Sequence, residues 1–310
     1  MIQVEGLTKN YGSRRAVDNI SFHVSRGEIV GFLGPNGAGK TTTLRILTGY
    51  MPASEGTATV AGFDVFEESI EVRRRVGYLP ETVPLYDDMA VWQFLDFMAE
   101  LRKVPNRAER VEETMELVQM RDRADTLIGN ISKGMRQRVG LGQAILHEPE
   151  VLILDEPTIG LDPHQVRDVR DLIRDVGKDR TVILSTHILS EAQALCNRVL
   201  IINEGEIVAT DSPQKLQERL SGGEQVRIHI GGDSDGLLKV IDKVKGVSAS
   251  RDLGNDFFEI DIDNGKVRAD LARVIVKGKY DLDEMRSQNM SLEEIYLQLI
   301  QSDKVVGGEA

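Results

Sequence analysis

The chain has 310 residues, of which 41% are hydrophobic and 28% charged, a composition typical of a globular protein with a sizeable core. Its formal charge of -12 argues against a nucleic-acid partner, because phosphate backbones are bound by concentrated basic surfaces. The single cysteine, Cys196, rules out an intrachain disulfide and suits a reducing compartment. We expect it to be a small apolar filler in a helix.

No apolar run approaches the ~18 residues that a membrane-spanning helix needs. The longest runs, such as residues 199–202, have the length of a strand. Met1 leads directly into a strand-like segment, so we expect no signal peptide. These features predict a cytoplasmic protein whose contact with a membrane goes through another protein.

The first two-thirds of the chain alternate short β-branched runs with helical patterns, which predicts an α/β domain around a largely parallel sheet. The candidate buried strands are residues 29–33, 151–154, 181–185 and 199–202. The alternation breaks at residues 89–120, where apolar residues recur at helical intervals and Pro105 separates two helices. We expect an all-α insertion there, a helical subdomain over about residues 82–148.

A second domain is expected after Ser221-Gly222-Gly223, which has the composition of a flexible joint. The segments that follow alternate as strand, helix, strand, strand, helix and strand, the order of a small α+β ferredoxin-like domain. A last amphipathic helix is predicted over residues 292–300, after the capping residue Ser291. The predicted domains are therefore residues 1–219 and 224–310.

A complete G-x-x-x-x-G-K-[ST] pattern follows the predicted strand 29–33 and precedes a predicted helix. In such a loop, backbone N–H groups and the helix N-terminus point at phosphates. Lys40 would hold the β- and γ-phosphates, and the Thr41 hydroxyl would hold Mg²⁺. The alternative, a glycine-rich turn without function, does not explain why lysine and threonine stand in register. The loop and the residue after it are Gly34, Pro35, Asn36, Gly37, Ala38, Gly39, Lys40, Thr41 and Thr42.

Two carboxylates, Asp155 and Glu156, follow the predicted buried strand 151–154. Acids at the end of a buried strand are unfavourable unless a cation neutralises them. Asp155 is placed to serve Mg²⁺, and Glu156 to serve as the general base for an attacking water. His187 follows another predicted strand, at the sheet edge where ligands bind in such folds.

Together these residues resemble the nucleotide-binding domain of ABC transporters over residues 1 to about 215, with a P-loop NTPase fold. The resemblance implies that Tyr11 stacks on adenine and that His187 contacts the γ-phosphate. It also implies that Asp162, in Gly160-Leu161-Asp162, belongs to a loop that touches the opposite subunit.

The family's signature, usually Leu-Ser-Gly-Gly-Gln, has two candidates. The string LSGGEQ at residues 220–225 lies beyond His187 and leads into a predicted strand. The signature serine and glycine have to lie at a helix N-terminus to reach a γ-phosphate. Ser132, Lys133 and Gly134 precede a predicted helix over residues 135–146, so we assign the signature to them.

Two positions depart from the family pattern. Lys133 stands where glycine is usual, and Glu81 stands where glutamine is usual. A carboxylate can still ligate Mg²⁺ or its water, so the expected metal residues are Thr41, Glu81 and Asp155. Both departures resemble the drug-resistance and gliding-motility type exporters of the family.

The resemblance implies an ATP-hydrolysing subunit that closes head to tail with a second such subunit around two ATP molecules. Ser132 and Gly134 of one chain would complete the site of the other. ATP and Mg²⁺ are the expected ligands, and membrane-spanning permease subunits are the expected partners. The resemblance to the exporter subgroup implies export. The rival reading is an ABC ATPase that acts on ribosomes or DNA; the single cassette, the lack of a long coiled-coil insertion and the negative charge count against it.

Overall fold

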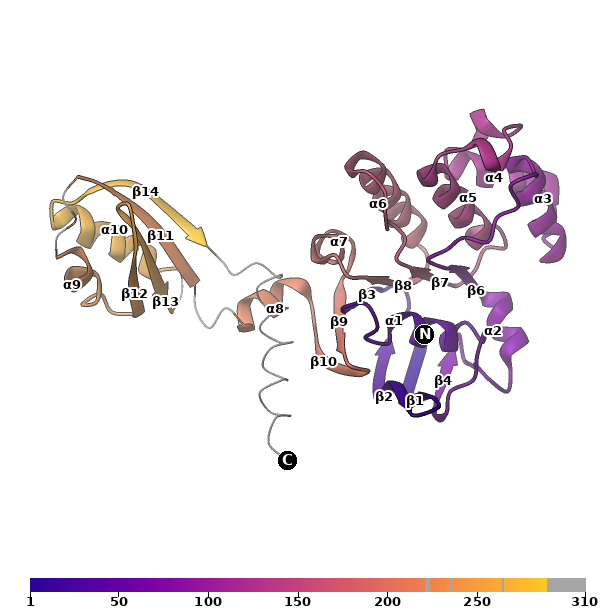
Figure 1. Ribbon diagram of the computed structural model, residues 1–310, viewed down its shortest axis with the longest axis horizontal. Helices are drawn as coiled ribbons and strands as arrows, with labels where there is room; N and C mark the ends of the chain where they lie inside the picture. Colours follow the sequence, from indigo (N-terminus) through magenta and orange to yellow (C-terminus); the bar gives the residue numbers. More distant parts are fainter. Residues whose placement is uncertain (221–223, 233, 235, 264, 289–310) are drawn as a thin grey trace. The chain divides into compact units, whose positions relative to one another are not determined.

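The computed structural model describes residues 1–220, 224–232, 234, 236–263 and 265–288. The chain divides into two compact units, Met1–Ser212 and Pro213–Ala310. The first unit contains two sheets and the helices that cover them (Figure 1). The fold class expected for it, a P-loop ATPase cassette with a mostly parallel sheet and a helical insertion, is confirmed.

The central sheet of the first unit has six strands in the order β10-β9-β3-β8-β7-β6. All neighbours are parallel except β10, which pairs antiparallel with β9. Every residue of β7 and β8 is buried, as is usual for parallel strands covered on both faces. The strands are β3 (Ile29–Leu33), β6 (Val76–Leu79), β7 (Val151–Asp155), β8 (Thr181–Thr186), β9 (Arg198–Asn203) and β10 (Glu206–Asp211). The four buried strands predicted from the sequence are all present.

A second, antiparallel sheet in the order β2-β1-β4-β5 precedes most of the parallel strands in the chain. The sequence did not distinguish it from the parallel sheet, because β1 and β2 are long and only partly alternating in hydrophobicity. Its strands are β1 (Ile2–Tyr11), β2 (Arg14–Val24), β4 (Glu55–Val60) and β5 (Phe63–Asp64).

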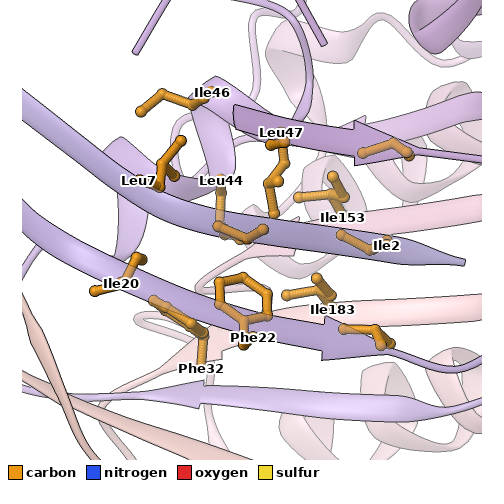
Figure 2. Close-up of a cluster of buried hydrophobic side chains, with 14 of the residues drawn as sticks. Ile2, Leu7, Ile20, Phe22, Phe32, Leu44, Ile46, Leu47, Ile153 and Ile183 are labelled. Carbon is orange, nitrogen blue, oxygen red and sulfur yellow. The ribbon is translucent and has the colours of Figure 1, made fainter. Parts of the chain in front are cut away.

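One hydrophobic core joins these two sheets through helix α1 (Lys40–Leu47). Figure 2 shows side chains of β1, β2, β3 and α1 converging with Ile153 of β7 and Ile183 of β8. The rings of Phe22 and Phe32 lie 5.7 Å apart between centroids. Because the helix that follows the phosphate loop is buried in this core, packing holds the loop in place.

The helical region is confirmed between β6 and β7. It consists of α3 (Val91–Leu101), α4 (Arg107–Leu117), two short 3₁₀ turns and α5 (Lys133–Ile145). Helix α5 begins two residues before the predicted start. The remaining helices of the unit are α2 (Ser69–Arg75), α6 (Pro163–Gly177) and α7 (Leu189–Leu195). The 3₁₀ turns are Arg121–Arg123 and Ile128–Asn130.

Cys196 lies one residue beyond α7 and is buried. A Cβ at Gly31 of β3 would lie 2.8 Å from its Sγ, so the thiol fills the space that this glycine leaves. Burial raises the pKa of the Cys196 thiol to about 12. The residue is the apolar filler that was expected, at the end of the helix rather than inside it.

The second unit contains a four-stranded antiparallel sheet in the order β12-β13-β11-β14, with three helices among its described residues. Apolar residues from the strands and from two of these helices, Leu237–Ile241 and Val267–Lys277, form a core of its own. Its elements are α8 (Pro213–Leu220), β11 (Glu224–Gly231), α9 (Leu237–Ile241), β12 (Val247–Gly254), β13 (Phe257–Ile262), α10 (Val267–Lys277) and β14 (Asp281–Gln288). The helix predicted over residues 292–300 and the joint at 221–223 lie outside the described residues. Within the described part of the chain, no helix is long and apolar enough to cross a membrane.

A partly buried histidine makes the stability of the first unit depend on pH. His147 lies between α5 and β7, with Nε2 3.1 Å from the carbonyl oxygen of Val76. Burial, and after it the charge of Arg102, lower the pKa of His147 to about 4. The folded state therefore binds fewer protons than the unfolded state between pH 6.5 and pH 4, and stability is lost as the pH falls through that range.

We predict that the free energy of unfolding falls by about 2 kcal/mol between pH 7 and pH 5 through His147. The variant His147→Gln keeps a hydrogen-bond donor for the carbonyl oxygen of Val76 but does not titrate. It should therefore lack this fall in the free energy of unfolding. Urea unfolding followed by the fluorescence of Trp92, the single tryptophan, measures it. Exposed His164→Gln is the control; equal pH dependence of all three proteins would contradict the prediction.

Candidate active site

The phosphate loop connects β3 to α1 as predicted. Gly37 and Gly39 have φ of 84° and 109°, in the region that only glycine adopts readily. A Cβ at Gly34 would lie 2.3 Å from the carbonyl oxygen of Ile202, so this position has no room for a side chain. Gly39 caps α1 without a side-chain hydrogen bond, which leaves the first turn of the helix facing the loop as an anion site.

Lys40 lies inside this loop and is 5% exposed. Its Nζ donates to the carbonyl oxygen of Gly34 at 2.7 Å and to that of Pro35 at 3.2 Å. The same atom lies 3.3 Å from Glu156 Oε1. The ammonium group is thus fixed between the loop that would surround the phosphates and the carboxylate at the end of β7.

Asp155 and Glu156 end β7, and both are buried, with 1% and 5% exposed. Asp155 Oδ1 accepts from the hydroxyls of Ser185 at 2.6 Å and Thr41 at 3.2 Å. Ser185 also accepts from the backbone N–H of Glu156 at 2.9 Å. These bonds join the ends of β7 and β8 to the first turn of α1.

Asp155 Oδ2 has no hydrogen-bond partner among the described residues, and Glu156 Oε1 has none either but lies 3.3 Å from the ammonium group of Lys40. An unpaired buried carboxylate oxygen is unfavourable and is a natural position for a cation or a water. Thr41 and Asp155 therefore fit a Mg²⁺ site, with Thr41 Oγ1 already beside Asp155. Among the described residues, no three His, Cys, Asp or Glu side chains gather as metal ligands.

His187 follows β8, next to β7 in the sheet. Its Nδ1 lies 2.9 Å from Glu156 Oε2, and its side chain is 38% exposed. Glu156 itself has a φ of 48°, unusual for a residue with a side chain. The carboxylate of Glu156 thus lies between Lys40 and His187.

A cavity of about 370 Å³ opens over this arrangement. Predicted residues from four segments line it: Tyr11 of β1, the phosphate loop with the start of α1, Glu81 after β6 and Glu156 after β7. The lining residues are Tyr11, Arg14, Ala16, Asn36, Gly37, Gly39, Lys40, Thr41, Thr42, Glu81 and Glu156.

Arg14 and Ala16 also line the cavity and were not predicted from the sequence. Arg14 pairs with Tyr11 across the turn between β1 and β2. Gly12 and Ser13 between them have the composition of a two-residue hairpin turn, and this signal could have placed Arg14 opposite the predicted aromatic residue.

The signature residues lie elsewhere. Ser132 caps α5, where its Oγ accepts from the N–H of Met135 at 3.3 Å. Gly134 is buried, and a Cβ there would meet Gln165 Oε1 at 2.7 Å. Asp162 caps α6 and accepts from the N–H groups of His164 and Gln165, each at 3.0 Å. None of Ser132, Lys133, Gly134 or Asp162 lines the cavity of the same chain.

The second signature-like string does not precede a helix. It lies between the end of α8 and the start of β11, and its residues 221–223 are outside the described part of the chain. In contrast, α5 begins directly after Ser132.

Comparison with known proteins agrees with this site. The family model for ABC transporters matches residues 17–159. The linearmycin resistance ATP-binding protein of Bacillus subtilis is 31% identical over 96% of this chain and 98% of its own length. The bacitracin transport ATP-binding protein of Bacillus licheniformis is 40% identical over 71% of this chain and 72% of its own. An ATP-binding cassette solved as a dimer in a post-hydrolysis state with ADP and Pi covers 68% of this chain and 98% of its own, at 22% identity and a TM-score of 0.63.

Two relatives that match nearly the whole chain are named ATP-binding proteins. In this chain Lys40, Thr41 and Glu156 line one cavity of about 370 Å³. The chain therefore belongs to the ABC transporter family, as an ATP-binding subunit and ATPase.

Proposed function

We propose that this chain hydrolyses Mg²⁺-bound ATP between two cassettes and thereby drives a membrane-spanning permease, in the direction of export. The observation that carries the proposal is the position of the Glu156 carboxylate, buried at 5% exposure between Lys40 and His187 at the edge of the cavity. A carboxylate held there by a cation and an imidazole can accept the proton of a water that attacks the γ-phosphate.

The other site residues bind and orient the substrate in this proposal. Lys40 exchanges its contacts with the carbonyls of Gly34 and Pro35 for the β- and γ-phosphates. Tyr11, 47% exposed, offers its ring to adenine. Thr41, Asp155 and Glu81 would hold Mg²⁺, which would supply positive charge to neutralise the charge that develops on the phosphates. His187 keeps the general base Glu156 in position and lies on the side open to the γ-phosphate.

A second cassette is needed because Ser132, Lys133, Gly134 and Asp162 do not line the cavity of their own chain. Ser132 and Gly134 lie at the start of α5, a 13-residue helix whose N-terminus favours an anion. Lys133 adds an ammonium group to that N-terminus. We infer that these residues bind the γ-phosphate held by a partner chain, and that the two chains close head to tail. The solved dimer of the same fold supports such a pairing.

A cavity of about 400 Å³ is the proposed docking site for the permease. It lies between β6, α1 and the helical region, beside the segment from Glu81 to Met89, so movement of the helical region on ATP binding would reach it. Its lining residues are Arg45, Tyr50, Tyr78, Pro80, Thr82, Pro84, Phe94, Met98, Arg102 and Gln143. We place the protein on the cytoplasmic face of the membrane through this contact. The resistance and transport names of its relatives support export.

We infer that residues 1–219 form the ATP-binding domain, with a helical subdomain over about 82–148, and that residues 224–310 form an accessory ferredoxin-like domain. The strand order β12-β13-β11-β14 and the βαββαβ succession support the latter. Its separate core supports a regulatory or dimer-supporting role without part in catalysis.

We predict that Glu156→Gln keeps ATP binding and lowers turnover by roughly 10²- to 10⁴-fold, because an amide cannot accept the proton of the water. The trapped ATP-bound dimer should appear in light scattering as a doubling of mass. Phosphate release at a near-native rate would remove Glu156 from the role of general base.

We predict that Ser132→Arg blocks closure and hydrolysis, whereas Ser221→Arg leaves both nearly unchanged. A guanidinium side chain at the start of α5 would occupy the space of the partner's γ-phosphate. ATP-dependent dimerisation and phosphate release measure the two effects. Loss of activity in the Ser221 variant alone would show that the signature is the later string.

A further inference from the structure

A buried carboxylate, Glu191 of α7, lies between the two loops that carry Glu156 and His187 and has no role in the mechanism above. It is 2% exposed. Its Oε1 accepts from the hydroxyl of Thr158 at 2.5 Å, and its Oε2 from that of Thr186 at 2.9 Å. Thr158 comes two residues after Glu156, and Thr186 directly before His187. One side chain therefore ties both loops together.

The direction of these hydrogen bonds is fixed by the carboxylate. An ionised carboxylate only accepts, so both threonine hydroxyls have to donate to it. The oxygen of Thr186 then accepts from the backbone N–H of Ile188 at 2.9 Å. This chain of bonds, from Ile188 through Thr186 to Glu191, closes the turn that contains His187.

The turn after β7, which contains Glu156 and Thr158, is also held by Glu191. Glu156 has a φ of 48°, a strained conformation that persists only where the surroundings hold it. The N–H of Ile159 donates to the carbonyl of Glu156 at 3.1 Å and closes the turn after β7. The hydroxyl of Thr158, inside that turn and 3% exposed, is anchored on Glu191.

A third element approaches the same carboxylate. Arg170 of α6 places Nη2 4.0 Å from Glu191 Oε1. The guanidinium provides a positive charge near the buried carboxylate, and α6 is the helix that Asp162 caps. Glu191 is therefore the common partner of the end of β8, the turn after β7 and α6.

We propose that Glu191 is a positioning residue for ATP hydrolysis: it holds the turns at Glu156 and His187 in register, so that the 2.9 Å contact between these two side chains forms. This inference rests on the roles proposed above for Glu156 and His187. Glu191 does not line the nucleotide cavity, so its loss should affect the rate of hydrolysis rather than nucleotide binding.

The test is a substitution series in the full chain, with steady-state phosphate release from Mg·ATP and binding of the fluorescent analogue TNP-ATP as readouts. Glu191→Ala should lower kcat by roughly tenfold to a hundredfold, since small misplacements of catalytic groups have effects of that size. KM and the TNP-ATP affinity should stay within about twofold. Glu191→Gln should recover most of kcat, because one oxygen still accepts from Thr186 while the amide can donate to Thr158.

Thr186→Val removes one hydroxyl at nearly constant volume and tests the route of the effect. If Glu191 acts through Thr186, the two substitutions should not have additive effects. The kcat of the double variant Thr186→Val with Glu191→Ala should then lie within about twofold of the kcat of the slower single variant. If Glu191→Ala does not fold, as judged by thermal unfolding, Thr186→Val alone has to show the loss of kcat at constant KM. Exposed Gln193→Ala on the same helix is the matched control and should keep wild-type kinetics.

Two results would overturn the inference: a kcat of Glu191→Ala within twofold of wild type, or parallel losses of kcat and TNP-ATP affinity that Glu191→Gln does not repair. Glu156→Gln, measured in the same series, separates this from failure of the proposed function. An active Glu156→Gln protein refutes the role of the base itself. An inactive Glu156→Gln protein together with an active Glu191→Ala protein refutes only the role of Glu191.

Discussion

The structure depends on the burial of two adjacent carboxylates, Asp155 and Glu156, at the end of the buried strand β7. They are 1% and 5% exposed, and each keeps one oxygen without a hydrogen bond from the described residues. A buried unpaired charge typically destabilises a protein by several kcal/mol. Among the described residues, the ammonium group of Lys40 lies 3.3 Å from Glu156 Oε1, and the ring of His187 lies 2.9 Å from Glu156 Oε2. The site is therefore built to receive further positive charge together with a phosphate ligand.

The remaining architecture explains how such a pair is tolerated. Parallel strands bring the ends of β3, β7 and β8 to one edge, so the loop lysine and the hydroxyls of Thr41 and Ser185 reach the carboxylates. The core around α1 fixes the loop from behind, and the antiparallel sheet contributes Tyr11 to the cavity. These local arrangements oppose stability and favour ligand binding, as is common at functional sites.

The sequence predicted the features that depend on residues close together in the chain. The spacing of glycines before lysine and threonine located the phosphate loop, and a serine before a helix pattern located the start of α5. It did not predict contacts made only by the tertiary fold. Arg14 reaches the cavity through a hairpin, and the antiparallel sheet was not separated from the parallel one. Glu191 is an ordinary acid in a helix pattern until β8 and the turn after β7 place two threonines against it.

The central claim, that the site stores uncompensated negative charge until a nucleotide and its cation bind, is tested most directly by Asp155→Asn. Its Oδ1 can still accept from Thr41 and Ser185, while one buried charge is removed. The measurement is the unfolding midpoint of the ligand-free protein and its rise with ATP in Mg²⁺ or in EDTA. We predict that the ligand-free variant is as stable as the wild type or more stable by about 1–2 kcal/mol. We also predict that ATP raises its unfolding midpoint by the same amount in Mg²⁺ and in EDTA. A less stable ligand-free variant that keeps the Mg²⁺-dependent rise would contradict the account.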